Sequence, residues 1–196
     1  MAKTLDRREA KPMSANHQEL ERHYQKTCDQ WPDRKVEIIN GRIVVRELPT
    51  LNHAKSILQL LIQLIPFATE QGWHPVYDVK IFLGVQKDRY RPDLLVLPKF
   101  PRMWDDENVY AEEALLVVEV VSPSSRDDDH VTKPQNCAIA GVPLYLVIDA
   151  TQNLVRLLSH PGERGYQQQH QVIIGEPLEL PAPWNLTIDT GKLSEG

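Results

Sequence analysis

The alternation of apolar and polar positions along the chain predicts several short strands and few helices. The first clear element is a hairpin over residues 36–45, where two β-rich runs flank Asn40-Gly41. This pair favours a type I′ turn, which needs positive φ at both central residues. Further strands are predicted where short apolar runs are bounded by turn residues. They cover residues 76–83, 93–97, 115–121, 144–149, 154–158 and 167–174.

A long helix is predicted after the hairpin. The apolar positions of residues 57–68 recur at helical spacing. Thr50 or Asn52 can cap the start of this helix, and Gly72 stops it. Pro66 lies inside the pattern and should kink the helix or end it early.

A second, shorter helix is expected over residues 134–140, closed by Gly141. The resulting order of elements is typical of an α/β or α+β fold with a mixed sheet and few helices. Residues 1–32 lack sustained apolar periodicity and are interpreted as a tail with a helix over residues 16–26. Residues 177–196 are interpreted as a surface tail with a short strand.

The length of 196 residues suits one domain with a sizeable core, which we place at residues 33–180, with residues 181–196 as a C-terminal tail. No window approaches the roughly 18 apolar residues of a membrane span, and the polar start lacks a secretory apolar region. Cys28 and Cys137 form no CxxC pair, so reduced thiols and a cytoplasmic location are expected. A net charge of −5 argues against a protein that coats nucleic acid but permits a local basic patch.

Two carboxylates occur in or beside the most apolar runs. Asp93 lies where a strand emerges from a loop, and Glu119 lies in mid-strand, on the same face as Val117 and Val121. An ionised carboxylate in such a run is costly to bury unless a cation or several donors compensate it. Two of them on neighbouring strands, with Lys133 after a short loop, indicate a divalent-metal site.

These residue types are the ones that phosphodiester hydrolysis requires. Mg²⁺ takes oxygen ligands, typically one or two carboxylates, and leaves room for a phosphate. Such a metal polarises the phosphodiester and lowers the pKa of a bound water, while a lysine orients that water or steadies the developing charge.

A wider set of motifs surrounds the two acids. The set consists of Arg91-Pro92-Asp93-Leu94-Leu95-Val96, Val117-Val118-Glu119-Val120-Val121-Ser122-Pro123-Ser124-Ser125-Arg126, Asp129, Lys133, Ala140-Gly141-Val142-Pro143 and Tyr145-Leu146-Val147-Ile148-Asp149. Together they resemble the Uma2 family, formerly a domain of unknown function common in cyanobacteria, within the PD-(D/E)xK restriction-endonuclease-like superfamily. The resemblance covers about residues 36–174, and the hairpin and His53 match the N-terminal half of the family.

The resemblance implies a restriction-endonuclease-like core with an N-terminal β-hairpin. By position, Asp93 resembles the first metal-binding acid of the superfamily and Glu119 the second. The superfamily lysine normally lies two residues after the second acid, where this chain has Val121. The resemblance therefore implies that Lys133 supplies the amine from the following helix. Glu37 matches an acidic residue of the first family strand that can approach the same metal.

One departure from the family pattern concerns the lysine. Pro134 follows Lys133, where family members usually have a helix-forming residue. Proline is accepted in the first turn of a helix, but it disfavours the α region for the residue before it. We therefore expect Lys133 to lie at the helix cap, aimed differently from the usual arrangement.

Structural explanations are open for each acid. Asp93 could brace the turn after its neighbouring proline, and Glu119 could form a buried pair with Arg91 or Lys80. Glu37 also fits the alternating charges of an edge hairpin.

Other site classes are less consistent with the sequence. His53, near a helix start, is interpreted as a capping or surface residue, and the seven histidines show no zinc-binding spacing. The serines after the second acid lack a GxSxG context, which argues against a serine hydrolase. No GxxxxGK[ST] loop exists to hold nucleotide phosphates.

One basic-rich stretch lies close to the acids in the sequence and could contact nucleic-acid phosphates. The residues assigned to this role are Lys80, Lys87, Arg89 and Arg91. The alternative is a solvated strand face balanced by Asp78 and Asp88.

The sequence thus favours a Mg²⁺- or Mn²⁺-dependent endonuclease that hydrolyses DNA, with Asp93 and Glu119 on the metal and Lys133 assisting. The alternative is a catalytically inactive nuclease-fold homologue that binds nucleic acid or protein, which Val121, Pro134 and the negative net charge favour. A homodimeric structural protein is a third hypothesis. A homodimer alone does not decide between them, because many nucleases of this fold pair their subunits.

Overall fold

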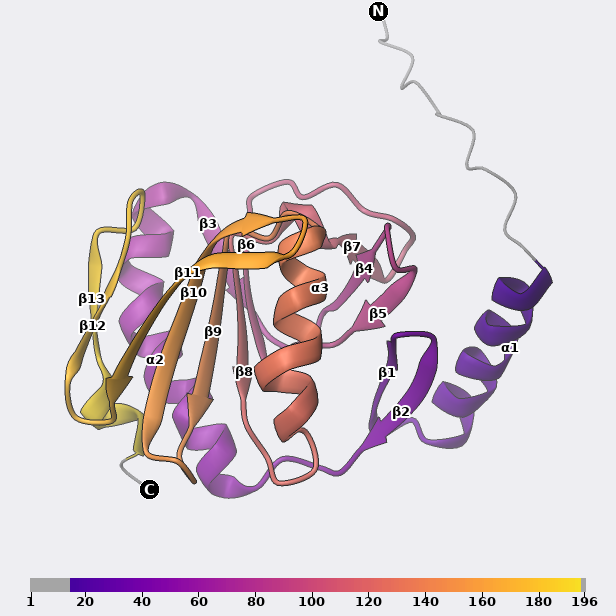
Figure 1. Cartoon of the computed structure of the whole chain (residues 1–196), viewed down its shortest axis with the longest axis horizontal. Coiled ribbons are helices and arrows are strands. Elements are labelled where there is room, and N and C mark those ends of the chain that lie inside the picture. Colours follow the sequence, from indigo (N-terminus) through magenta and orange to yellow (C-terminus); the bar gives the residue numbers. More distant parts are fainter. Residues whose placement is uncertain (1–14, 195–196) are drawn as a thin grey trace, which may run out of the picture.

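The computed structural model describes residues 15–194, which form three α-helices, two mixed sheets and a separate hairpin (Figure 1). The helices are α1 (Ala15–Gln30), α2 (Leu51–Gln71) and α3 (Lys133–Ile139), with short helical turns η1 (Ala111–Glu113), η2 (Asp128–Thr132) and η3 (Thr190–Ser194). The strands are β1 (Lys35–Ile39), β2 (Arg42–Arg46), β3 (Trp73–Val76), β4 (Lys80–Leu83), β5 (Asp88–Tyr90), β6 (Leu94–Pro98), β7 (Asn108–Tyr110), β8 (Leu116–Val120), β9 (Leu144–Asp149), β10 (Leu154–Gly162), β11 (Gly165–Ile173), β12 (Pro177–Leu180) and β13 (Leu186–Asp189). The predicted α+β architecture with few helices is confirmed.

The larger sheet has the strand order β11-β10-β9-β8-β6-β3, and only β8 and β9 run parallel. On one face, Leu60 and Leu64 of α2 pack in a core that includes Val118. On the opposite face, Cys137 of α3 packs in a second core that includes Val117. Strands β6, β8 and β9 are therefore buried on both faces, which explains their continuous apolar sequences.

The smaller sheet has the order β2-β1-β5-β4-β7 and contains the predicted hairpin. Asn40 and Gly41 have φ values of 48° and 71°, as the Asn-Gly pair predicts. Asp88 of β5 accepts hydrogen bonds from both turn amides, at 2.7 Å from Asn40 and 3.1 Å from Gly41. Because Asp88 is fully buried, its interpretation as a charge on a solvated strand face is wrong. Burial raises the pKa of the Asp88 carboxyl.

Helix α2 begins and ends at the predicted signals. The side chain of Thr50 accepts a hydrogen bond from the His53 backbone N–H, and Gly72 closes the helix with a φ of 69°. The expectation that Pro66 could end the helix early is wrong, because the helix continues past it. Pro66 cannot bond to the carbonyl of Ile62, but both residues are exposed, so water can satisfy that carbonyl.

The predicted strand over residues 76–83 is two strands in different sheets. β3 lies at the edge of the larger sheet, whereas β4 belongs to the smaller one. The chain turns between them at Asp78, which has a φ of 65°. No glycine or proline marks this turn in the sequence. Strands β5 and β7 were missed because each has three residues, too few for alternation to be visible.

The described part of residues 177–196 is not a surface tail, which corrects that interpretation. β12 and β13 form a hairpin, and Trp184, Ile188 and Leu193 are buried in the core beneath α2. The Trp184 ring lies 4.8 Å from Trp73, measured between ring centroids. The many prolines and polar residues between the apolar positions hid this hairpin from the sequence analysis. The predicted domain boundaries at residues 33 and 180 stay a prediction.

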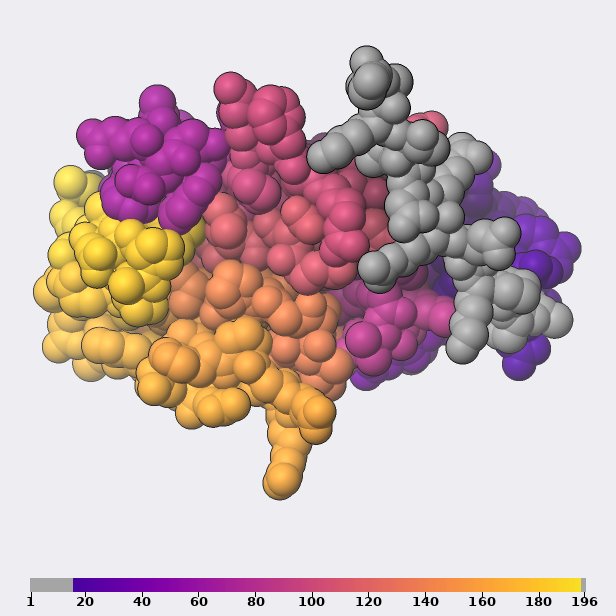
Figure 2. Space-filling view, turned by 90° about the horizontal axis from the view of Figure 1, so that it is seen from above, coloured from indigo at the N-terminus to yellow at the C-terminus, as the bar shows by residue number. Residues whose placement is uncertain are grey.

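The helix expected over residues 16–26 is confirmed as α1, which extends further in both directions. It is attached to the smaller sheet, because Tyr24 is buried against Val36 and Ile38 of β1. The N-terminal and C-terminal elements lie at opposite ends of the molecule (Figure 2). In the described part of the chain, no helix is both long enough and apolar enough to cross a membrane.

We expect Trp184→Ala to destabilise the protein by about 3–5 kcal/mol, the usual cost of truncating a buried large aromatic residue. Urea denaturation followed by circular dichroism measures this change. Phe100→Ala is the matched control, because Phe100 is 84% exposed and should change the free energy of unfolding by only about 0.5 kcal/mol. Equal effects of the two substitutions would show that the C-terminal hairpin is not part of the core.

Candidate active site

The two acids singled out in the sequence lie side by side on adjacent strands. Asp93 immediately precedes β6, Glu119 lies within β8, and the two strands pair antiparallel. One oxygen of Asp93 accepts a hydrogen bond from the Val120 backbone N–H at 2.8 Å, which fixes its position beside Glu119. The side chains of Val117 and Val121 lie in the core on the α3 side of the sheet, and Glu119 reaches the same side, as alternation predicted.

Lys133 is buried at the centre of a cluster of carboxylates. Its Nζ lies 2.8 Å from Glu119, 3.1 Å from Glu37 and 3.1 Å from Asp129. All four side chains are almost completely buried. The structure therefore brings together the second acid, the acid of the first strand and the lysine of the helix, which are far apart in sequence.

Lys133 lies where η2 ends and α3 begins, so its expected position at the helix cap is confirmed. The expected departure from the α region is wrong, because Lys133 adopts α-helical dihedral angles (φ −65°, ψ −45°). The preceding turn η2 is a π-helix, in which the Lys133 N–H bonds to the Asp128 carbonyl five residues earlier. A proline leaves the carbonyl four residues before it without a partner. Here that carbonyl belongs to His130, and Arg156 donates a hydrogen bond to it at 2.7 Å.

A second lysine, Lys35 at the start of β1, also belongs to the site and was missed from the sequence. Its Nζ lies 3.0 Å from Asp93 and 3.0 Å from Glu119. The pairing of Glu119 with Arg91 or Lys80, considered from the sequence, is therefore wrong: Lys35 and Lys133 compensate its charge. The available signal was the spacing of two residues between Lys35 and Glu37, which places both on one face of the first strand.

His53 is a further site residue whose interpretation changes. It lies in the first turn of α2, but its ring is mostly buried, with Nε2 3.2 Å from an Asp93 oxygen. Asp93 therefore contacts His53 on one side and Lys35 on the other. The capping interpretation missed this contact because it needs α2 and β6 to be placed in three dimensions.

The charged groups shift one another's pKa values. Burial alone would raise the pKa of Asp93, but the Lys35 ammonium and the His53 ring hold it well below its usual range. Burial also opposes ionisation of Glu37, yet the Lys133 and Lys35 ammonium groups lower its pKa. For Glu119, burial opposes ionisation, the two lysines favour it and Asp93 and Asp129 add like charge, so its pKa is raised. The pKa values of both lysines are raised, since burial is outweighed by the surrounding carboxylates.

The geometry of Asp93 and Glu119 fits a small divalent cation. One oxygen of each carboxylate lies 3.0 Å from the same point, the Lys35 ammonium, so the two acids already converge on a positive charge. Two carboxylates completed by water and phosphate are a common donor set for Mg²⁺. In residues 15–194, no group of three or more His, Cys, Asp or Glu side chains is arranged to hold a metal. Glu37 does not complete such a group: it forms an ion pair with Lys133 and accepts a hydrogen bond from the Arg91 backbone N–H.

Most residues of the basic stretch have structural partners. Lys80 pairs with Glu107 at 2.6 Å. Arg89 is buried, pairs with Glu21 at 2.6 Å and stacks 4.2 Å from the centre of the Trp104 ring. These contacts explain why the stretch is basic without involving phosphate.

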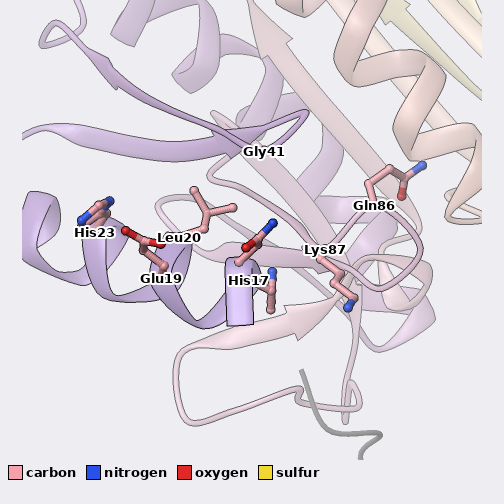
Figure 3. A pocket seen from close by; sticks show the side chains of 8 residues that line it. His17, Glu19, Leu20, His23, Gly41, Gln86 and Lys87 are labelled. Atoms are coloured by element: carbon pink, nitrogen blue, oxygen red, sulfur yellow. The ribbon is translucent and has the colours of Figure 1, made fainter. Parts of the chain in front are cut away.

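The remaining two basic residues lie in different surroundings. Arg91 pairs with Asp78 and donates a hydrogen bond to the Arg34 carbonyl at 3.2 Å. Lys87 is exposed and lines a cavity of about 520 Å³ between α1 and the β4–β5 turn, across from His17 and Leu20 (Figure 3). This cavity is lined by none of the acids described above.

The fold is similar to that of a putative nuclease, and the sequence matches a family of putative restriction endonucleases. The family model described as "Uma2: Putative restriction endonuclease" matches residues 18–190, and the chain belongs to this family. A search of curated proteins finds no match. A crystal structure of "a putative nuclease belonging to DUF820" from Anabaena variabilis ATCC 29413 is similar in fold, with a TM-score of 0.66 and 14% identity over 81% of this chain and 88% of that one. The type IIG restriction endonuclease BpuSI matches 80% of this chain but 18% of its own length, with a TM-score of 0.42 and 15% identity.

We expect Lys133→Met to destabilise the protein by about 3–5 kcal/mol, because it leaves buried carboxylates without their common cation. Urea denaturation at neutral pH measures the loss. Lys192→Met is the control: Lys192 pairs with Asp189 at 3.5 Å, is exposed, and should contribute less than about 1 kcal/mol. A loss no larger than that of the control would contradict the buried arrangement.

Proposed function

We propose that this protein is a Mg²⁺- or Mn²⁺-dependent endonuclease that hydrolyses DNA phosphodiester bonds, with Asp93 and Glu119 holding the metal. The observation that supports this most directly is the convergence of their two carboxylate oxygens on one cationic point. Membership of the Uma2 family supports the nuclease class. A restriction-endonuclease-like site typically uses a divalent metal, which polarises the phosphodiester and lowers the pKa of a bound water.

In this proposal, each residue around the metal position has a separate role. Asp93 is held by the Val120 amide and His53, which keeps its oxygens aimed at the metal position. Lys133 keeps Glu119 oriented from the buried side. Glu37, assigned from the sequence as a further metal ligand, instead fixes Lys133 in this proposal.

DNA contact would use a different surface from the one expected from sequence. Arg42 and Arg126 line a polar cavity of about 430 Å³ with Ser124 and Thr132, beside the helical turn that leads to Lys133, and Asp127 and Asp128 line it as well. Both arginines are exposed, unlike Arg89. Exposed arginines and hydroxyl groups are common phosphate ligands in protein–DNA contacts.

The second candidate function is a catalytically inactive nuclease-fold module that binds nucleic acid or protein. Two observations favour it: Val121 is buried in the core at the superfamily lysine position, and Lys35 already pairs with both proposed metal-binding acids. A module of this kind need not bind metal, so calorimetric titration of Mn²⁺ separates the two candidates.

We expect Asp93→Asn and Glu119→Gln to abolish metal binding, seen by Mn²⁺ titration calorimetry, and to lower plasmid cleavage by a factor of at least about 10². Glu107→Gln is the control, because Glu107 is an exposed acid paired with Lys80 away from the site. It should leave both measurements unchanged. Unaltered metal binding in the Asp93 and Glu119 variants would reject the assignment of these acids.

A further inference from the structure

We infer that Lys35, rather than Lys133, is the lysine that contacts the phosphate undergoing hydrolysis. This inference rests on the proposed nuclease function and deepens it by exchanging the roles of the two lysines. Lys35 reaches the site from β1, whereas Lys133 reaches it from α3, on the far side of Glu119.

Lys133 is enclosed by the protein. A lysine has three N–H donors and no acceptor, and three carboxylate oxygens lie within 3.1 Å of its Nζ. The side chain is 1% exposed. A phosphate could approach this ammonium only by displacing one of the buried carboxylates, which would leave that charge unpaired.

Lys35 has the properties that Lys133 lacks. Its side chain is 21% exposed, and its Nζ donates hydrogen bonds to Asp93 and Glu119, which uses two of its three N–H groups. Its flexible four-carbon stem allows the ammonium to move without a change in the backbone. When a divalent cation takes the position between the two acids, Lys35 can turn toward a phosphate bound at the same open edge.

The role of Lys35 is electrostatic. In the hydrolysis, a water oxygen forms a bond to phosphorus while the bond from phosphorus to one ester oxygen breaks. The attacking water loses a proton to solvent, and the leaving ester oxygen takes one up. Lys35 keeps its protons and neutralises the charge that accumulates on a non-bridging oxygen.

The test separates metal binding from cleavage in the full chain. In Lys35→Gln, we expect Mn²⁺ affinity without DNA to rise about tenfold or more, because a competing positive charge is removed. Cleavage at saturating Mn²⁺ should fall by about 10²-fold, and Lys35→Arg should recover part of it. Lys133→Gln should instead lose metal affinity and stability together, since it releases Glu119.

Two results would overturn the inference, and they can be told apart. If the wild-type protein binds Mn²⁺ and cleaves DNA, and Lys35→Gln matches it within about twofold, Lys35 has no such role. If the wild-type protein neither binds Mn²⁺ nor cleaves, the proposed function fails and the role of Lys35 fails with it. Thermal unfolding of each variant shows whether it is folded before either conclusion is drawn.

A separate observation concerns the outer face of α2. Four of its apolar side chains are between 47% and 70% exposed. They are Leu51, Leu58, Ile62 and Ile65. With Lys55 and Thr69 they follow an alternating spacing of four and three residues along one side of the helix, the pattern of a coiled-coil seam. We call these six residues the α2 stripe.

We propose that the α2 stripe of a second copy of this chain covers this surface, with the two helices antiparallel. The argument is charge complementarity. Lys55 lies near one end of the helix and Glu70 near the other, and neither forms an ion pair within the part of the chain that the structure describes. A two-fold axis that places Ile62 opposite Ile65 brings Lys55 of each copy close to Glu70 of the other. Parallel pairing would set like charges against each other.

Analytical ultracentrifugation tests this pairing. The wild-type protein should be a dimer and Ile62→Glu a folded monomer, because Ile62 is exposed within one chain. The melting temperature of the variant should no longer depend on protein concentration, as that of a dimer does. Lys55→Glu should weaken the dimer, and the double variant Lys55→Glu/Glu70→Lys should restore it. A monomeric wild-type protein, or a double variant no better than the single one, would overturn the proposal. Co-flotation of the monomer with anionic vesicles would assign the stripe to a membrane surface instead.

Discussion

The structure depends on one buried ammonium group. Lys133 of α3 meets Glu37 from the smaller sheet, Glu119 from the larger sheet and Asp129 from the π-turn, so a single charge joins the separate layers of the protein. Burying any one of these carboxylates alone would be prohibitive, and burying the lysine alone would be equally so. Each group therefore determines where the others can lie, and the site cannot form until both sheets and the helix are in place.

The two lysines of the site contact the acids from different sides. The inner carboxylates face Lys133, whereas the outer oxygens of Asp93 and Glu119 face Lys35 at a partly open edge. The inner part is closed to solvent, because Lys133, Glu37 and Asp129 are almost completely buried. The outer part can exchange its cation, because Lys35 is held by one flexible side chain rather than by its backbone. In the proposed site, stability and metal binding would depend on opposite sides of the same glutamate.

Patterns of neighbouring residues were enough to predict most helices and strands and the acids of the site, but not all of the contacts between those acids and other residues. The Asn40-Gly41 turn, the ends of α2 and the face of Glu119 follow from patterns within a few residues, and each was predicted correctly. The contacts of Lys35 and His53 with Asp93 could not be predicted in this way. They join elements that are distant in sequence, and a lysine at a strand start or a histidine in a first helical turn is ordinary without that tertiary contact. The short strands β5 and β7 were not predicted for a local reason: a strand of three residues is too short to show alternation.

Lys133 reaches Glu119 from the side of the larger sheet that α3 covers. Val121, which directly follows β8, packs in the core on that same side. An amine from α3 can reach Glu119 from that same side only if the helix continues through Lys133 despite Pro134. The π-turn makes this possible by shifting the Lys133 N–H to the Asp128 carbonyl, and Arg156 satisfies the His130 carbonyl that the proline leaves free. Arg156 is distant from the acids in sequence, and its hydrogen bond removes one cost of this proline, the unpaired carbonyl. The other cost is the steric restriction that Pro134 places on Lys133, which nevertheless keeps α-helical dihedral angles.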